Sequence, residues 1–159
     1  MAIPAEDAWR PERAAEIIAA GVGREGATLP ILHALQDAFG HIPEAAIPMV
    51  AEALNLTRAE VHGIVGFYRD FRRAPAGRHV LRLCRAEACQ SRGAEALAAQ
   101  AQAALEVGWG ETSRDRAVTL EPVFCLGLCA TAPAALLDDR PVGRLDREGL
   151  AALLDEARK

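Results

Sequence analysis

Apolar residues in the N-terminal half of the sequence recur every three or four positions, which is the spacing of one buried helix face. The first such segment begins at Pro11, a residue suited to the first turn of a helix, and stops at Gly21. The second begins at Thr28, which we expect to cap it, and stops at Gly40. A third segment covers residues 42–54, and Pro48, which belongs within a first turn, leaves the exact start of its helix open. The pattern therefore predicts three helices in this stretch.

A fourth helix has the clearest start in the chain. Thr57 and Glu60 have the spacing of a capping box, in which each side chain bonds the backbone N–H of the other residue. The apolar face of this helix is expected to comprise Val61, Ile64, Val65 and Tyr68. Gly63 and Gly66 lie together on another side, although each costs about 1 kcal/mol relative to alanine in a helix. Close approach of another surface would account for both glycines.

The helical pattern breaks at residues 72–78, a stretch that includes Pro75 and Gly77, and we place a domain boundary there. Residues 1–76 are expected to form a small bundle of about four helices, with residues 1–10 as a flexible tail. Residues 77–159 are expected to form a second domain.

The second domain alternates between strand and helix patterns. The predicted elements are, in order, a strand at 79–84, an alanine-rich helix at 93–105, a strand at 117–121, two strands at 134–137 and 142–145 around a turn at 138–141, and a last helix capped by Asp146. Helices and strands alternating in this way predict an α/β domain that follows a helical one.

Composition and charge argue against several classes of protein. The 159 residues carry a net charge of −4 with acids and bases mixed along the chain, so the basic stripe of a nucleic-acid-binding protein is missing. Although 51% of the residues are hydrophobic, no apolar run approaches the roughly 20 residues of a membrane span. The start, Met-Ala-Ile-Pro-Ala-Glu-Asp, lacks the basic and apolar segments of a signal peptide. We therefore expect a soluble, cytoplasmic protein.

Two other patterns are interpreted as structural. Gly21, Gly23 and Gly26 have the spacing of a dinucleotide-binding fingerprint, but a helical segment precedes them where such a site needs a strand. The histidines have no cysteine or carboxylate cluster beside them in the sequence and are expected to be structural: His33, His41, His62 and His79. We expect no catalytic residue in this chain.

The four cysteines form the candidate site for chemistry. They occur as two close pairs, Cys84 with Cys89 in a C-x4-C pattern and Cys125 with Cys129 in a C-x3-C pattern. Each pair follows a predicted strand, so we expect both pairs in loops at one end of the sheet. Two distant pairs of this kind indicate that four sulfur atoms converge on one object.

The spacing discriminates among the roles of these cysteines. Disulfides belong mainly to secreted chains, and redox dithiols need a C-x-x-C pattern. Zinc knuckles usually hold two residues between their cysteines and often include histidine. Four thiolates without histidine suit an iron–sulfur cluster best, and two pairs suit a two-iron cluster with one pair on each iron. A zinc-stabilised interaction module is the alternative from another class.

Three neighbours of the cysteines bear on this chemistry. Gly127 is expected to let its loop bring backbone N–H groups close to the sulfur atoms, where they would tune a reduction potential. Arg82 and Arg85 either offset the negative charge of four thiolates or are simply solvated, and the sequence leaves both interpretations open.

The chain resembles the thioredoxin-like [2Fe-2S] ferredoxins in the segments Cys84-Arg-Ala-Glu-Ala-Cys89 and Phe124-Cys125-Leu-Gly-Leu-Cys129. That family includes the small peripheral subunit of NADH dehydrogenase and its relatives in NAD-linked hydrogenases and formate dehydrogenases. The sequence of residues 84–97 and 119–129 is similar to that of the gamma subunit of the soluble, molybdenum-containing NAD-dependent formate dehydrogenase. The resemblance extends from about Leu29 to the C-terminus.

The resemblance implies a thioredoxin-like fold for residues 77–159 and one [2Fe-2S] cluster held by Cys84, Cys89, Cys125 and Cys129. It implies an electron-transfer subunit docked beside a flavin- and NAD-binding subunit, in one complex with a molybdenum-containing formate dehydrogenase catalytic subunit. FMN, further iron–sulfur clusters and the molybdenum cofactor would then lie on those partners. The alternative within this class is the equivalent subunit of respiratory NADH dehydrogenase or of a NAD-reducing hydrogenase.

Overall fold

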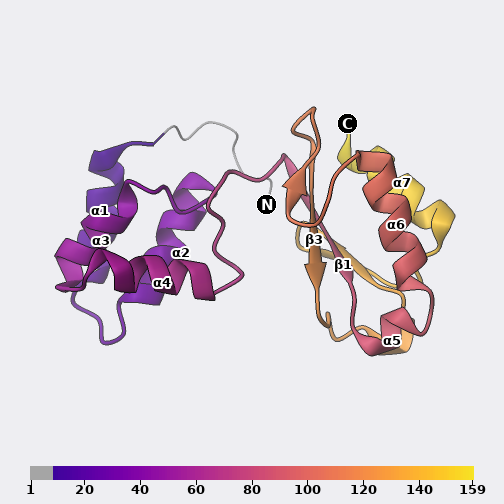
Figure 1. Ribbon diagram of the computed structural model, residues 1–159, viewed down its shortest axis with the longest axis horizontal. Helices are drawn as coiled ribbons and strands as arrows, with labels where there is room; N and C mark the ends of the chain where they lie inside the picture. Colours follow the sequence, from indigo (N-terminus) through magenta and orange to yellow (C-terminus); the bar gives the residue numbers. More distant parts are fainter. Residues whose placement is uncertain (1–8) are drawn as a thin grey trace. The chain divides into compact units, whose positions relative to one another are not determined.

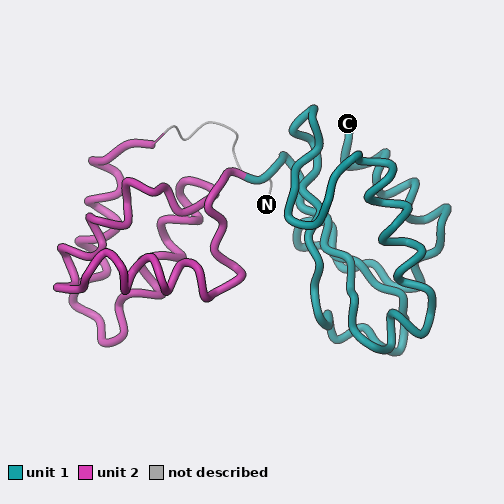
Figure 2. The backbone as a smooth tube through the Cα atoms, in the orientation of Figure 1, with its two compact units in different colours: residues 1–3, 76–159 teal, residues 4–75 magenta. Residues whose placement is uncertain are grey.

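The computed structural model describes residues 9–159, so most of the tail expected over residues 1–10 lies outside the described residues. The described chain divides into two compact units, the first ending at Pro75 and the second beginning at Ala76 (Figure 2). Each unit has a hydrophobic core of its own. Among the helices that the structure describes, none is long and apolar enough to cross a membrane.

The first unit is helical. Its elements are α1 (Pro11–Gly21), α2 (Thr28–Phe39), α3 (Ala46–Leu54) and α4 (Arg58–Phe67) (Figure 1). α1 packs against α2 and α3, and α3 packs against α4. The core between them is made of aliphatic side chains at helical spacing and includes Ile18, Ile31, Leu32, Leu35, Val50, Val61 and Val65.

The start of α2 differs from the prediction, and the structure gives the start of α3 that the sequence left open. Thr28 is the first residue of α2 and not its cap, because the preceding Ala27 already has helical angles and its carbonyl accepts the N–H of Ile31. Helix α3 begins at Ala46, whereas Ile42 lies in a non-helical segment and donates its N–H to the carbonyl of Arg72 at 2.7 Å. In both places a neighbouring backbone decides where the helix starts.

The predicted capping box is confirmed at the start of α4. The N–H of Thr57 donates to the Glu60 carboxylate at 2.8 Å, and the N–H of Glu60 donates to the Thr57 hydroxyl at 3.2 Å. These bonds hold the pKa of Glu60 below its usual value, because they stabilise the charged carboxylate.

The predicted apolar face of α4 is wrong at its end. Val61 and Val65 are buried, but the helix stops at Phe67 and Tyr68 is extended and exposed.

The two glycines of α4, Gly63 and Gly66, approach no other backbone within the described chain. A Cβ at Gly63 would meet nothing within 4 Å, and at Gly66 it would meet only the tip of Arg73 at 3.9 Å.

The second unit is a five-stranded sheet with helices packed against it. Its elements are β1 (His79–Cys84), α5 (Glu87–Gln90), α6 (Ala94–Leu105), β2 (Glu111–Thr112), β3 (Val118–Val123), a 3-10 turn (Cys129–Thr131), β4 (Ala135–Leu137), β5 (Arg140–Val142) and α7 (Arg147–Ala157). The strand order is β2-β3-β1-β4-β5. α6 and α7 pack against each other on one face of the sheet (Figure 1).

The pairing of β1 with β3 sets the geometry of this unit. The two strands are parallel and in register from His79 beside Val118 to Cys84 beside Val123, whereas the other pairs are antiparallel. Leu81 and Leu120 are fully buried in the core under α6 and α7. Because the strands are parallel and in register, both end at the same edge of the sheet.

Three elements differ from the predicted pattern. The short helix α5 and the two-residue strand β2 are not predicted, since each is too short for a periodicity to develop. Strand β5 covers Arg140–Val142 and not residues 142–145, because the turn before it is tight and Asp138 adopts the left-handed conformation with φ 53°. Asp146 caps α7 as predicted, accepting the N–H of Gly149 at 2.7 Å.

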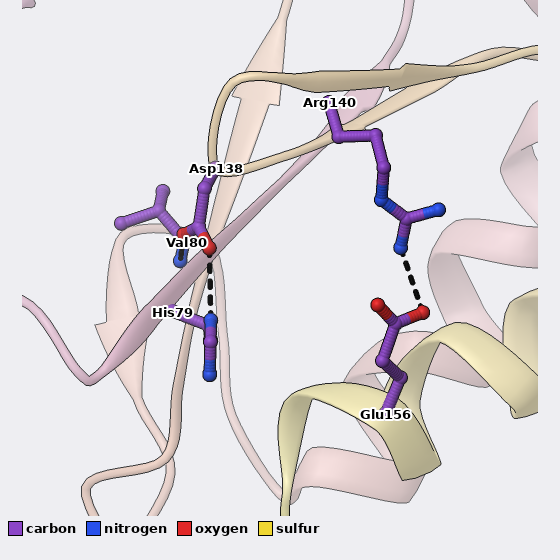
Figure 3. Close-up of polar contacts among 5 residues, drawn as sticks. All are labelled: His79, Val80, Asp138, Arg140 and Glu156. Carbon is purple, nitrogen blue, oxygen red and sulfur yellow. Dashed lines mark hydrogen bonds and ion pairs between the residues drawn. The ribbon is translucent and has the colours of Figure 1, made fainter. Parts of the chain in front are cut away.

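Asp138 also ties this turn to the start of β1 (Figure 3). One carboxylate oxygen lies 2.8 Å from His79 Nδ1, and the other accepts the N–H of Val80 at 2.9 Å. Close by, Arg140 pairs with Glu156 of α7 at 2.7 Å. His79 is therefore part of a structural contact, at the end of β1 opposite to Cys84.

The capping box gives a matched pair of substitutions. Thr57→Ala should lower the free energy of unfolding by about 1 kcal/mol, because it removes a side-chain cap. Thr28→Ala should leave it nearly unchanged, because no side chain caps α2. Urea denaturation followed by circular dichroism measures both, and an equal loss in the two variants would contradict the assignment.

Asp138→Ala should lower the free energy of unfolding by about 2 kcal/mol, since two donors lose a charged acceptor. Asp138→Asn should cost less, because an amide oxygen still accepts from Val80 and asparagine tolerates the left-handed conformation. The same denaturation experiment compares them. Equal losses in the two variants would show that these hydrogen bonds contribute nothing.

Candidate metal centre

The four cysteines meet at the edge of the sheet where β1 and β3 end. Cys84 is the last residue of β1, and Cys89 lies in α5. Cys125 follows β3, and Cys129 begins the 3-10 turn. Their closeness follows from the parallel register, which places Cys84 beside Val123, two residues before Cys125.

The two pairs differ in burial. Cys84 and Cys89 are each only 2% exposed and pack with Ala94 and Ala134 in a small apolar cluster. Cys125 and Cys129 are exposed, with their sulfur atoms 3.8 Å apart. All four are free thiols, so the structure contains no disulfide among them. One pair is thus shielded from water, and the other forms the outer edge of the site.

Backbone N–H groups of the loop after β3 point at the sulfur atoms. Gly127 donates its N–H to Cys125 Sγ at 3.3 Å, which confirms that this loop brings a backbone N–H close to sulfur. The N–H groups of Cys125 and Leu126 act on the Cys84 sulfur. Successive N–H groups that converge in this way form a concave site that favours negative charge.

The loop holds this shape at a conformational cost. Cys125 has φ 102° and Gly127 has φ 74°, both in a region that only glycine adopts readily. A non-glycine residue in a sparsely populated region costs about 1–3 kcal/mol and persists where the surroundings impose it, often at functional sites. The unusual backbone at Cys125 therefore marks this loop as a functional one.

The thiols influence each other's protonation. Burial acts to raise the pKa of Cys84, but hydrogen bonds from the backbone of Ala86 and from Cys89, Cys125 and Leu126 outweigh it, so that its pKa is lowered. Burial and the hydrogen bond with Cys84 raise the pKa of Cys89. The contact with Cys125 raises the pKa of Cys129. The surroundings therefore favour the thiolate form at Cys84 and disfavour it at Cys89 and Cys129.

The residue types of the site suit an iron–sulfur cluster. The two loops bring four cysteine thiols and no histidine to the site. Two pairs on adjoining loops, all of them sulfur, fit a two-iron cluster with one pair on each iron.

The two arginines nearest the cysteines in sequence are neutralised. Arg82 pairs with Glu121 on the neighbouring strand at 3.0 Å. Arg85 makes a bidentate pair with Glu95 of α6 and lies over the ring of Trp109. Both side chains are therefore held in ion pairs rather than simply solvated. The partial offset of thiolate charge stays a prediction.

One contact in this site has no signature in the sequence. Gln90 donates its side-chain amide to the carbonyl of Arg85 at 2.7 Å, which ties the end of the C-x4-C loop to its start. A glutamine directly after a cysteine carries no distinctive signal.

Two of the histidines expected to be structural contact groups of the helical unit. The ring of His33 lies against Phe71, with the two ring planes tilted by 52°, and His41 bonds the carbonyl of Phe39.

Comparisons with known proteins agree with this geometry. The chain is 37% identical to a subunit of the NADH-quinone oxidoreductase of Pseudomonas aeruginosa, over 81% of this chain and 78% of that protein. It is 35% identical to a subunit of the NADH-quinone oxidoreductase of Thermus thermophilus, over 83% of this chain and 74% of that protein. A crystal structure of NAD⁺-reducing [NiFe]-hydrogenase superposes with a TM-score of 0.68 at 28% identity, over 80% of this chain but only 22% of that one.

The fold and the paired cysteines point to the class of small iron–sulfur proteins with a thioredoxin-like sheet. The thioredoxin-like [2Fe-2S] ferredoxins match residues 14–158, nearly the whole chain. The chain therefore belongs to the thioredoxin-like [2Fe-2S] ferredoxin family, whose members carry a [2Fe-2S] cluster. The match to this family confirms the expected [2Fe-2S] cofactor and the expected thioredoxin-like fold.

The backbone of the cysteine loop gives a second matched pair of substitutions. A Cβ would meet nothing within 4 Å at either Gly127 or Gly63, so the two positions differ in backbone conformation. Gly127→Ala should lower the free energy of unfolding by about 1 kcal/mol because of its left-handed φ. Gly63→Ala should raise it by up to about 1 kcal/mol, because α4 gains a helix-favouring residue. Thermal denaturation that gave both changes the same sign would contradict this account.

Proposed function

We propose that this chain is an electron-transfer subunit that holds one [2Fe-2S] cluster through four ligands, Cys84, Cys89, Cys125 and Cys129. Cys84 and Cys89 bind one iron in this proposal, and Cys125 and Cys129 bind the other. The observation that carries it is the convergence of both pairs at one sheet edge, with backbone N–H groups aimed at the sulfur atoms.

The bound cluster would accept and release one electron at a time. The chain's own residues determine how that electron enters and leaves. Cys84 and Cys89, with the apolar side chains around them, exclude water from one side. Cys125, Cys129 and the 61%-exposed ring of Phe124 form the open side, where a redox partner would come close.

We further propose that the chain works as two domains, residues 1–76 and residues 77–159. The first supplies a helical surface, and the second carries the cluster. Both would dock on a larger subunit that binds FMN and NAD and holds further iron–sulfur clusters. Support comes from the relatives, whose names describe subunits of NADH-quinone oxidoreductases, and from the compactness of each unit.

For the parent complex we propose a soluble NAD-dependent formate dehydrogenase with a molybdenum-containing catalytic subunit. The support is the resemblance in sequence around the cysteines to the gamma subunit of that enzyme. Formate would yield carbon dioxide, a proton and two electrons there, and NAD⁺ would take up two electrons and a proton at the flavin subunit. The alternative is the equivalent subunit of an NADH dehydrogenase or a NAD-reducing hydrogenase. The similarity to proteins of those two kinds favours this alternative.

Metal analysis tests the cluster. Iron, acid-labile sulfide and zinc should be measured on anaerobically purified protein, followed by an EPR spectrum after reduction with dithionite. The proposal expects two irons and two sulfides per chain, as in the [2Fe-2S] family, and a paramagnetic reduced state. One zinc ion and no EPR signal would identify the zinc-stabilised module instead.

Cys125→Ser tests the ligands. The variant should lose or alter the visible and EPR spectra of the cluster, because an alkoxide or hydroxyl replaces a thiolate on the outer iron. The helical circular dichroism should be retained, since Cys125 lies outside every helix and strand. An unchanged visible spectrum would remove Cys125 from the ligand set.

The parent complex is tested by purification from the source cells with a tag on this chain. Formate-dependent reduction of NAD⁺ by the purified complex supports the formate dehydrogenase. Activity that depends only on NADH and quinone, or on hydrogen, identifies the alternative.

A further inference from the structure

A cavity of about 590 Å³ opens beside the exposed cysteine Cys129. Three segments line it: the turn between α5 and α6, the stretch from Cys129 to Pro133, and the loop between β5 and α7. Arg92 comes from the first of these segments, and Arg144 comes from the third. Asp146 contributes a carboxylate to the same lining.

The charges in this cavity are not balanced. Within residues 9–159, the side chains of Arg92 and Arg144 make no hydrogen bond or ion pair, in contrast to Arg82 and Arg85. Asp146 uses one carboxylate oxygen as the cap of α7, where it accepts the N–H of Gly149. Two arginines therefore face one carboxylate beside Cys129, and the lining carries a net positive charge.

The backbone fixes both arginines next to the cysteine loops. The N–H of Arg92 donates to the carbonyl of Cys89 at 3.1 Å. The N–H of Arg144 donates to the carbonyl of Thr131 at 2.6 Å, in the turn that begins at Cys129. Gly143 allows this approach, since any side chain there would collide with Thr131.

Arg144 is also held in an unfavourable conformation. Its φ of 52° lies in the left-handed region, where glycine would be unstrained. Within the described residues its side chain makes no hydrogen bond or ion pair, and the strained backbone carries the N–H that bonds the carbonyl of Thr131. Strained backbone at such a position is often connected with function.

We propose that Arg92 and Arg144 raise the reduction potential of the cluster by placing uncompensated positive charge beside Cys129. This inference rests on the proposed function, since it requires the cluster to be held by the four cysteines. One-electron reduction makes the site more negative, and nearby positive charge stabilises that state more than the oxidised one. In the experiment below the electron comes from dithionite, which is oxidised, and no bond forms or breaks.

The test is a potentiometric titration of the anaerobically purified full chain, followed by the EPR signal of the reduced state. Arg92→Gln and Arg144→Gln should each lower the equilibrium constant for reduction about threefold. The double variant should lower it about tenfold, which is about 59 mV for a one-electron couple. Iron and sulfide content should stay equal to the wild type.

Arg114→Gln is the matched control, because it removes the same charge from another side chain without a bonded partner in the described chain. Arg114 lies in the turn before β3, at the end of that strand opposite to Cys125. About 20 Å of strand separates the two ends, beyond the ~8 Å screening length at physiological salt. The reduction potential of Arg114→Gln should therefore equal that of the wild type.

Two further variants separate charge from structure at position 144. Arg144→Lys keeps the charge and should keep the potential. Arg144→Gly relieves the left-handed backbone, so it should not destabilise the chain, yet it should lower the potential as Arg144→Gln does. If the reduction potential of the cluster changes with the free energy of unfolding of these variants, and not with the charge at position 144, the proposal is overturned.

The outcomes distinguish this inference from the proposed function. If the wild-type protein contains no iron or sulfide and gives no EPR signal, the proposed function itself is contradicted. A wild type with the cluster, but with both single variants matching Arg114→Gln, overturns the inference alone. If the double variant does not hold the cluster, the reduction potentials of the two single variants and of Arg144→Lys decide whether the inference holds.

Discussion

The parallel pairing of β1 with β3 is the constraint on which the site depends. Hydrogen bonding in register from His79 beside Val118 to Cys84 beside Val123 makes both strands end at one edge. Two cysteine pairs, far apart in sequence, thereby share a small volume. A parallel pair needs a crossover connection, and the segment with α5 and α6 provides it. The crossover thus carries a ligand, Cys89, as well as covering the sheet.

The loop after β3 then orients backbone groups around the sulfur atoms. Its left-handed residues, Cys125 and Gly127, turn successive N–H groups toward sulfur, which stabilises negative charge without using a side chain. The arginines near the site fall into two kinds. Arg82 and Arg85 are paired with carboxylates and brace the sheet and α6. Arg92 and Arg144 remain available for long-range electrostatics.

Features that depend on local sequence could be predicted, and features that depend on distant partners could not. The capping box of Thr57 and Glu60 and the Asp146 cap each lie within four residues, and both predictions are confirmed. The exact start of α3, which the sequence left open, is at Ala46, and Ile42 before it bonds the distant Arg72. Spacing alone indicates the cysteine pairs as the site. The carboxylate partners of Arg82 and Arg85, and the arginines that line the cavity beside Cys129, depend on tertiary structure and could not be predicted.

The most direct measurement of the central claim is X-ray absorption at the iron and zinc edges on anaerobically purified protein. The account predicts iron in an all-sulfur shell with a second iron as a close neighbour, as two cysteine pairs on a two-iron cluster require. Zinc surrounded by four sulfur atoms, with no neighbouring metal, would contradict it. In that case the four cysteines would serve folding alone.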